Sequence, residues 1–328
     1  MTARALVIGG TLLIGRALVE QLLDRGDEVT IMHRGDTTPF GTRVSQIKCD
    51  RNDTAAVRTA LDGARFDVIY DNVFDWNRGT SAEQVTAAAT ANVKGPRRYV
   101  FTSSVAVYAP GAVERDEDAP LVRSDDANGY GAKKADSERA LFALCRDRGL
   151  PVSTIRPAFI YGQYNPFDRE SFFWDRLLAG RPILVPEDGS TTMQWVNSKD
   201  VARASILAAE RDVAVGHAYN VANYPPITHA DFVRLLARIA GTTANLVFAP
   251  RERLLELGGG LSRPPYYFGA YLDLHSLTVR PDRVRSELGL ELTPLEDGFR
   301  DAYRWYRQQE RAKPDYSWED KALVALGR

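Results

Sequence analysis

Tyr130 and Lys134 have the residue types and the spacing for moving a proton at an oxygen atom. The stretch YGAKK opens a predicted helix, and residues four apart lie on the same helix face. An unperturbed phenol, with a pKa of about 10, is a poor base at neutral pH, and a neighbouring ammonium stabilises its phenolate. The pair therefore predicts an acid/base group. By spacing alone, an aromatic residue at a helix start and a surface lysine explain the pattern equally well.

A glycine-containing turn stands near the N-terminus, in the stretch VIGGTLLIG. Gly9 and Gly10 follow a short apolar run, and Gly15 lies in the helical pattern behind them. This order of strand, tight turn and helix is typical of a dinucleotide site, where the helix N-terminus faces the pyrophosphate. Leu12 stands where such turns usually carry glycine, so we expect its side chain to point away from the phosphate. The alternative is an ordinary structural turn.

The next predicted strands end in residues that could read the adenosine half of a dinucleotide. His33 and Arg34 occupy the strand end where an acid would accept a hydrogen bond from a free ribose 2′-hydroxyl. A guanidinium there can instead pair with a 2′-phosphate, which favours NADP(H) over NAD(H). The alternative is a solvated arginine. Asp50 ends the following strand and either faces the adenine or is a turn residue.

Composition limits the class of protein. The 328 residues carry 42 basic and 43 acidic side chains, a net charge of −1, without the basic patch of a nucleic-acid binder. Two cysteines and four histidines form no metal-ligand spacing, so we expect no metal site. We expect no leader peptide, and no apolar run in the sequence approaches the length of a membrane span. We expect a cytoplasmic protein with a small-molecule substrate, no nucleic-acid or membrane partner, and a chain compatible with a homodimer.

Short apolar strands alternate with amphipathic helices through the first half of the chain. This pattern predicts an α/β fold with a Rossmann-type doubly wound parallel sheet. We expect residues 1–162 and 195–222 to form the dinucleotide-binding domain, and residues 163–194 and 223–328 a smaller C-terminal substrate domain. Within the latter, Thr228 and Gly241 predict the two ends of a helix, and TPLEDGFRDAYRWYRQQ predicts another.

Seven motifs occur in the order of one known family: GGTLLIG, YVFTSSVAVY, YGAKK, IRPAFIYG, VNSKDVARA, AYNVAN and TPLEDGFRDAYRWY. In these motifs the chain resembles the extended short-chain dehydrogenases/reductases, the NAD-dependent epimerase/dehydratase family. The resemblance implies a reductase, epimerase or dehydratase acting on a secondary alcohol or ketone, including that of a sugar or sugar nucleotide. It also implies that Ser104, Tyr130 and Lys134 are the catalytic set. The turn with Leu12 is most similar to bacterial relatives of a chloroplast stem-loop RNA-binding protein.

The turn and the resemblance together predict a set of cofactor-binding residues: Gly9, Gly10, Thr11, Leu12, Leu13, Ile14, Gly15, His33, Arg34, Asp50, Arg51, Tyr130, Lys134 and Pro157. An RNA platform with this fold and a cofactor-bound sensor without turnover are the alternatives to an enzyme. The balanced charge and the complete catalytic set favour the enzyme.

The chain departs from the family's sugar-nucleotide enzymes at two positions. Phe159 replaces a common asparagine, and Met193 replaces a common arginine that grips the diphosphate of the substrate. A diphosphate could instead meet one of four other arginines, each of which is otherwise a solvated residue: Arg181, Arg251, Arg253 and Arg280. Two aromatic clusters could line a pocket or fill a core: Phe172, Phe173 and Trp174, and Tyr266, Tyr267, Phe268 and Tyr271.

Overall fold

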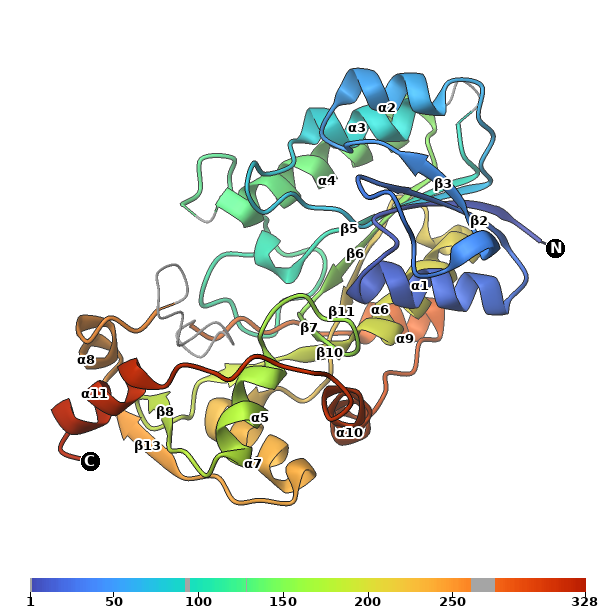
Figure 1. Ribbon diagram of the computed structural model, residues 1–328. Helices are drawn as coiled ribbons and strands as arrows, with labels where there is room; N and C mark the ends of the chain where they lie inside the picture. Colours follow the sequence, from blue (N-terminus) through green and yellow to red (C-terminus); the bar gives the residue numbers. More distant parts are fainter. Residues whose placement is uncertain (1, 92–94, 128, 261–274) are drawn as a thin grey trace.

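The computed structural model describes residues 2–91, 95–127, 129–260 and 275–328 (Figure 1). A seven-stranded sheet has the order β11-β6-β5-β4-β1-β2-β3, and its neighbouring strands are parallel. From β1 the chain builds one side of the sheet through β3, then returns and builds the other side. The predicted doubly wound sheet is therefore confirmed. The strands are β1 (Arg4–Ile8), β2 (Glu28–His33), β3 (Ser45–Lys48), β4 (Val68–Asp71), β5 (Arg98–Thr102), β6 (Val152–Pro157) and β11 (Ala218–Val221).

Helices cover both faces of this sheet (Figure 1). Side chains alternate along each strand, so Val7 and Leu6 of β1 belong to the cores on opposite faces. One face packs against α2 (Thr54–Leu61), α3 (Ala82–Thr90) and α4 (Gly129–Arg148), and the other against α1 (Leu13–Asp24), α6 (Ser198–Glu210) and α9 (Asp282–Leu288). The carboxyl ends of the parallel strands lie along one edge of the sheet, which is where ligands bind in open α/β sheets.

A second hydrophobic core lies between α5, α7 and α10 and the strands β8 and β13 (Figure 1). Phe173 and Trp174 are fully buried in it, so this aromatic run fills a core. The elements of this part are α5 (Glu170–Leu178), β8 (Ile183–Pro186), α7 (His229–Ala240), β13 (Leu246–Ala249), α8 (Arg251–Glu256), α10 (Leu295–Tyr306) and α11 (Ser317–Ala325). Two short pairs adjoin it: β7 (Phe159–Tyr161) with β10 (Trp195–Asn197), and β9 (Thr192–Met193) with β12 (Ile227–Thr228).

The predicted ends of α7 are confirmed. The Thr228 hydroxyl accepts a hydrogen bond from the Asp231 N–H at 3.1 Å, which caps the helix start. Gly241 ends the helix in the left-handed conformation, with φ +70°. The late helix predicted from TPLEDGFRDAYRWYRQQ is α10.

Within the described ranges, no helix has the length and apolar character that crossing a bilayer requires. In the same ranges, no three His, Cys, Asp or Glu side chains are grouped as ligands for a metal ion. Cys49 and Cys145 are both free thiols.

Candidate active site

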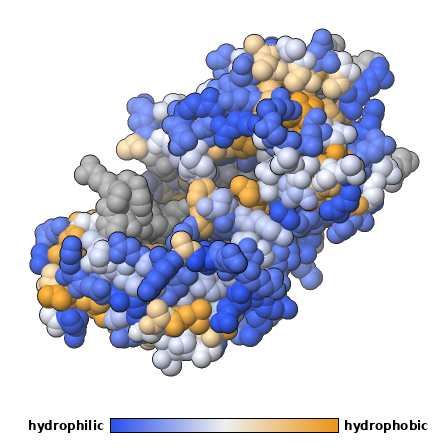
Figure 2. All heavy atoms as spheres, in the orientation of Figure 1, coloured by the Kyte–Doolittle hydropathy of each residue, from blue (hydrophilic) through white to orange (hydrophobic). Residues whose placement is uncertain are grey.

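A cavity of about 1040 Å³ lies at the carboxyl ends of the central strands. In Figure 2 the surface is hollowed near the middle of the molecule, and apolar atoms show inside the hollow. All but one of the predicted site residues line this cavity: Gly9, Thr11, Leu12, Leu13, Ile14, Gly15, His33, Arg34, Asp50, Arg51, Ser104, Tyr130, Lys134 and Pro157. The structure therefore brings together residues that are spread over 149 positions of the sequence, from Gly9 to Pro157.

Gly10 is the exception, and its surroundings show a packing role. A Cβ at this position would stand 2.9 Å from the Val19 side chain and 3.0 Å from that of Ile31. Gly10 therefore allows α1 to pack closely on the sheet, and it is absent from the residues that line the cavity.

Backbone geometry explains why the turn tolerates Leu12. Gly9 has φ +85°, and a Cβ on Gly15 would lie 1.8 Å from the Gly9 carbonyl oxygen, so both positions require glycine. Leu12 has φ −133° and ψ 155°, an extended conformation that any residue adopts. Its side chain is 52% exposed and lines the cavity. The strained residue is Leu13, with φ +42°.

The loop between β7 and α5 packs against this turn. The Leu13 N–H donates a hydrogen bond to the Tyr164 carbonyl at 3.2 Å. The Arg16 guanidinium stacks 3.4 Å from the centre of the Tyr164 ring. Phe167, further along the loop, lines the cavity. The glycine turn and the loop thus form two adjoining walls of the cavity.

Tyr130 and Lys134 project into the cavity from the first turns of α4. Lys134 is almost fully buried, and its ammonium donates a hydrogen bond to the Thr102 carbonyl at 2.6 Å. It also lies 4.5 Å from the centre of the Phe101 ring. Burial lowers the pKa of Lys134 to about 8, although the Asp71 carboxylate opposes the shift. At neutral pH the lysine therefore still carries a positive charge into the cavity.

Ser104 reaches the cavity from the end of β5. Its hydroxyl oxygen accepts a hydrogen bond from the Ala106 N–H at 3.1 Å and caps a single turn of 3₁₀ helix, Val105–Val107. Acting as an acceptor in this bond, the hydroxyl keeps its own proton for donation to a further partner. Ser104 is thus held at the sheet edge with a donor available.

Two buried polar atoms at the cavity have no hydrogen-bond partner among the described residues: the Ser103 hydroxyl oxygen and Asn72 Nδ2. The Thr102 hydroxyl donates to Asn72 Oδ1 at 2.6 Å, which orients the amide. Burying such groups unpaired costs about 1–3 kcal/mol each. A polar ligand group that forms hydrogen bonds with these two atoms would therefore bind favourably here. Sequence reasoning missed both residues, although each follows a parallel strand directly.

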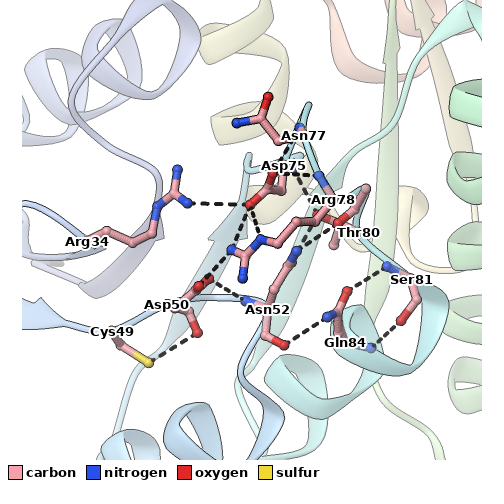
Figure 3. A network of polar contacts seen from close by, with 11 residues as sticks. Arg34, Cys49, Asp50, Asn52, Asp75, Asn77, Arg78, Thr80, Ser81 and Gln84 are labelled. Carbon is pink, nitrogen blue, oxygen red and sulfur yellow. Dashed lines mark hydrogen bonds and ion pairs between the residues drawn. The ribbon is translucent and has the colours of Figure 1, made fainter.

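At the other end of the cavity, charged residues form the network in Figure 3. Asp75 Oδ2 accepts from Arg34 Nη1 at 3.4 Å and from Arg78 Nη2 at 2.7 Å. Arg78 also donates to Asp50 at 2.7 Å, so Asp50 is an ion-pair partner here. Hydrogen bonds from the Arg78 backbone and side chain lower the pKa of Asp75 to about 2. The Arg34 side chain remains 67% exposed and contacts this network through Asp75.

Arg51 and His33 are engaged in other ways. The Arg51 guanidinium is buried, forms an ion pair with Asp71 and donates to the Gln84 carbonyl at 2.7 Å. His33 Nε2 lies 3.0 Å from the Gln46 side-chain oxygen. Arg51 thus holds β3, β4 and α3 together beneath the cavity.

The structure places some of the predicted substrate-side residues in the cavity lining and others away from it. Arg251 and Phe159 line the cavity, whereas Met193 is buried in the second core. The other arginines form ion pairs and are absent from the cavity lining: Arg181 with Asp320, Arg253 with Glu256, and Arg280 with Asp282. Tyr266, Tyr267, Phe268 and Tyr271 lie outside the described residues.

Comparison with known proteins identifies the family. The model of the NAD dependent epimerase/dehydratase family matches residues 5–222, and the chain belongs to this family. Two relatives align with most of the chain. The chloroplast stem-loop binding protein of 41 kDa b from Arabidopsis thaliana is 29% identical over 98% of this chain and 84% of the relative. A 2-alkyl-3-oxoalkanoate reductase from Stenotrophomonas maltophilia is 30% identical over 80% of this chain and 86% of the relative.

Solved structures share the fold. A UDP-glucose 4-epimerase from Thermus thermophilus, in complex with NAD, superimposes with a TM-score of 0.72 at 23% identity. The match covers 94% of this chain and all of that one. The family and fold therefore agree with those expected from the motifs.

The residues present fit a nicotinamide dinucleotide. The tight turn from Gly9 to Gly15 lines the cavity at the start of α1, where a helix N-terminus can bind a pyrophosphate. The orphaned polar atoms of Asn72 and Ser103 match the hydroxyl and carboxamide groups of such a cofactor, and the Lys134 ammonium lies at the same end. The cavity has the volume of a large ligand pocket, which spans up to about 1,000 Å³.

The buried charge of Lys134 leads to a stability prediction. The Lys134→Met variant should be about 1 kcal/mol or more stable at pH 7, because a buried ammonium is replaced by an apolar side chain. Between pH 8 and 10 the advantage should shrink. The folded protein releases this proton near pH 8 and the unfolded chain near 10.5, so wild-type stability rises across that interval relative to the variant. Chemical denaturation of both proteins at several pH values measures this. A variant less stable at pH 7 would contradict the prediction.

Proposed function

We propose that the protein is an NADP(H)-preferring oxidoreductase of this family, acting on a secondary alcohol or ketone. The observation that carries the proposal is the meeting of Ser104, Tyr130 and Lys134 in one cavity with the glycine turn. In this proposal the substrate lies between the dinucleotide-binding part, residues 1–162 and 195–222, and the remainder of the chain.

The side chains divide the proton chemistry between them. A bound nicotinamide dinucleotide supplies or accepts the hydride. Tyr130 gives its hydroxyl proton to the substrate oxygen during reduction and takes it back during oxidation. The Lys134 ammonium stabilises the phenolate, and the Ser104 hydroxyl donates a hydrogen bond to the same substrate oxygen. In this proposal the same ammonium also binds the ribose of the nicotinamide. Lys134→Ala should therefore weaken both turnover and cofactor binding.

A deuterium-transfer assay tests the activity. The protein is incubated with NADPH deuterated at C4 of the nicotinamide and with a panel of ketones and keto sugars, and mass spectrometry detects the label in the alcohol. Label on a carbinol carbon is expected for at least one compound class. A protein that binds NADPH and labels none of them would instead be a cofactor-bound sensor.

Cofactor choice rests on Arg34. The exposed guanidinium at the adenosine end can pair with a 2′-phosphate, so NADPH should bind more tightly than NADH. Arg34→Ala should cost roughly 10-fold or more in NADPH affinity, since one charge-assisted contact contributes about 1.5–3 kcal/mol, and should leave NADH nearly unchanged. Calorimetric titration of both nucleotides measures the preference. Equal affinities in the wild type, or equal losses in the variant, would favour NAD(H).

RNA binding is a second candidate, because one relative of this chain is named a stem-loop binding protein. The net charge of −1 argues against it, since few phosphates can be neutralised. Any binding to a structured RNA should therefore be weak and should vanish at moderate salt. Tight, salt-resistant binding in a filter or fluorescence assay would reverse this ranking.

A further inference from the structure

An aromatic wall, formed by Phe74, Trp76 and Phe167, stands beside Tyr130 in the cavity. Trp76 stacks on Tyr130, with ring centres 4.8 Å apart and planes inclined by 25°. Phe74 contacts the Tyr130 ring edge-on at 4.8 Å, and Phe167 contacts Trp76 edge-on at 5.6 Å. The loop after β4 and the loop before α5 thus meet through aromatic side chains at the proposed acid/base group.

Trp76 is incompletely covered by these contacts. It is 57% exposed, while other tryptophans of the fold, Trp174 and Trp195, are buried in the second core. An exposed indole that lines a concave site is covered when an apolar ligand binds, which removes its surface from water. Flat rings suit this wall best, because aromatic pairs gain from stacked and edge-to-face geometry beyond the area that they bury.

The substrate side has few described cations. Arg169 lies behind the wall: its Nη1 donates to the Ile160 carbonyl, and its guanidinium stacks 4.7 Å from the Phe167 ring centre. Arg251 also lines the described part of the cavity on the substrate side. Leu277 and Phe159 add apolar surface there. A diphosphate is gripped best by several convergent guanidinium or ammonium groups, so this lining favours an uncharged substrate.

We propose that the substrate carries a flat, apolar group, aromatic or conjugated, next to its carbonyl, and that Trp76 is the residue that selects it. This inference rests on the proposed reductase function. The aromatic wall holds the flat group while the carbonyl oxygen meets the Tyr130 hydroxyl. A sugar nucleotide is the competing substrate class.

Two methyl ketones of similar size test the selection. Acetophenone has a flat ring, and cyclohexyl methyl ketone has a puckered one. With NADPH, the wild type should show a KM for acetophenone roughly 2–10-fold lower than for the cyclohexyl compound, the range that an aromatic contact provides. Trp76→Leu should abolish this difference by raising the KM for acetophenone, whereas Trp76→Phe should keep most of it. Phe248→Leu, which removes an exposed ring outside the cavity, is the matched control and should change neither KM.

Binding measurements separate this inference from the function on which it rests. Calorimetry should give the same NADPH affinity for Trp76→Leu and the wild type, and weaker binding of UDP-glucose than of acetophenone to the NADP⁺ complex. Equal KM values for the two ketones, or tighter binding of UDP-glucose, would overturn the aromatic substrate and leave the reductase in place. Bound NADPH without reduction of any carbonyl compound would remove both proposals.

Discussion

Tyr130→Phe should retain NADPH affinity and lose about 100-fold or more in turnover, the scale of a lost acid/base group. The substitution removes one oxygen atom and keeps the ring, so the stacking on Trp76 and the edge contact with Phe74 are preserved. Lys134 remains buried against the Thr102 carbonyl and keeps its place in the cavity. The loss should therefore appear in kcat, with the cofactor Kd unchanged.

A second tyrosine provides the control for this experiment. Tyr303 lies on α10, packs against the second core and does not line the cavity, so Tyr303→Phe should keep normal turnover. Near-normal turnover of Tyr130→Phe would exclude the phenol as the proton donor. A parallel loss of NADPH affinity would instead indicate that the hydroxyl binds the cofactor.

Arg156→Leu should lower the free energy of unfolding by about 3–5 kcal/mol, because it leaves a buried carboxylate without its partner. Arg156 Nε donates to Glu138 at 2.9 Å, and both side chains are almost fully inaccessible. The same guanidinium donates to the Tyr108 hydroxyl at 2.6 Å, four residues after Ser104. Glu138 lies one helical turn after Lys134 on α4. This ion pair therefore joins the two segments that carry the proposed catalytic set.

Denaturant unfolding of three variants separates the ion pair from simple packing. Arg156→Leu combined with Glu138→Leu should recover at least half of the lost stability, since no charge is then left buried. Glu138→Gln should cost less than Arg156→Leu, because the amide keeps the shape and accepts a hydrogen bond. Equal stability of Arg156→Leu and the wild type would show that the pair contributes nothing net.

Local patterns made the sheet and much of the site predictable. The apolar strands and the glycine turn determine the parallel order, and parallel strands bring their carboxyl ends to one edge. The resemblance to the family implies that Ser104, Tyr130 and Lys134 act together, and all three line the cavity at this edge. The four-residue spacing on α4 placed two of them on a single helix face.

Contacts between residues that lie far apart along the chain could not be predicted from the sequence. Asp75 lies 41 residues after Arg34, and no local pattern indicates their contact. The sequence does not indicate that Trp76 lines the cavity, because an isolated tryptophan in a loop is compatible with a buried or an exposed position. Gly9 and Gly10 look equivalent in a sequence, and both are predicted cofactor-binding residues, whereas tertiary packing gives them different surroundings.

A crystal structure of the protein with NADP⁺ tests the central claim most directly. We predict the pyrophosphate at the start of α1, the 2′-phosphate at Arg34, and the nicotinamide beside the Tyr130 hydroxyl with its ribose within hydrogen-bond distance of Lys134. A dinucleotide bound outside this cavity, or with its nicotinamide remote from Tyr130, would contradict the proposed function.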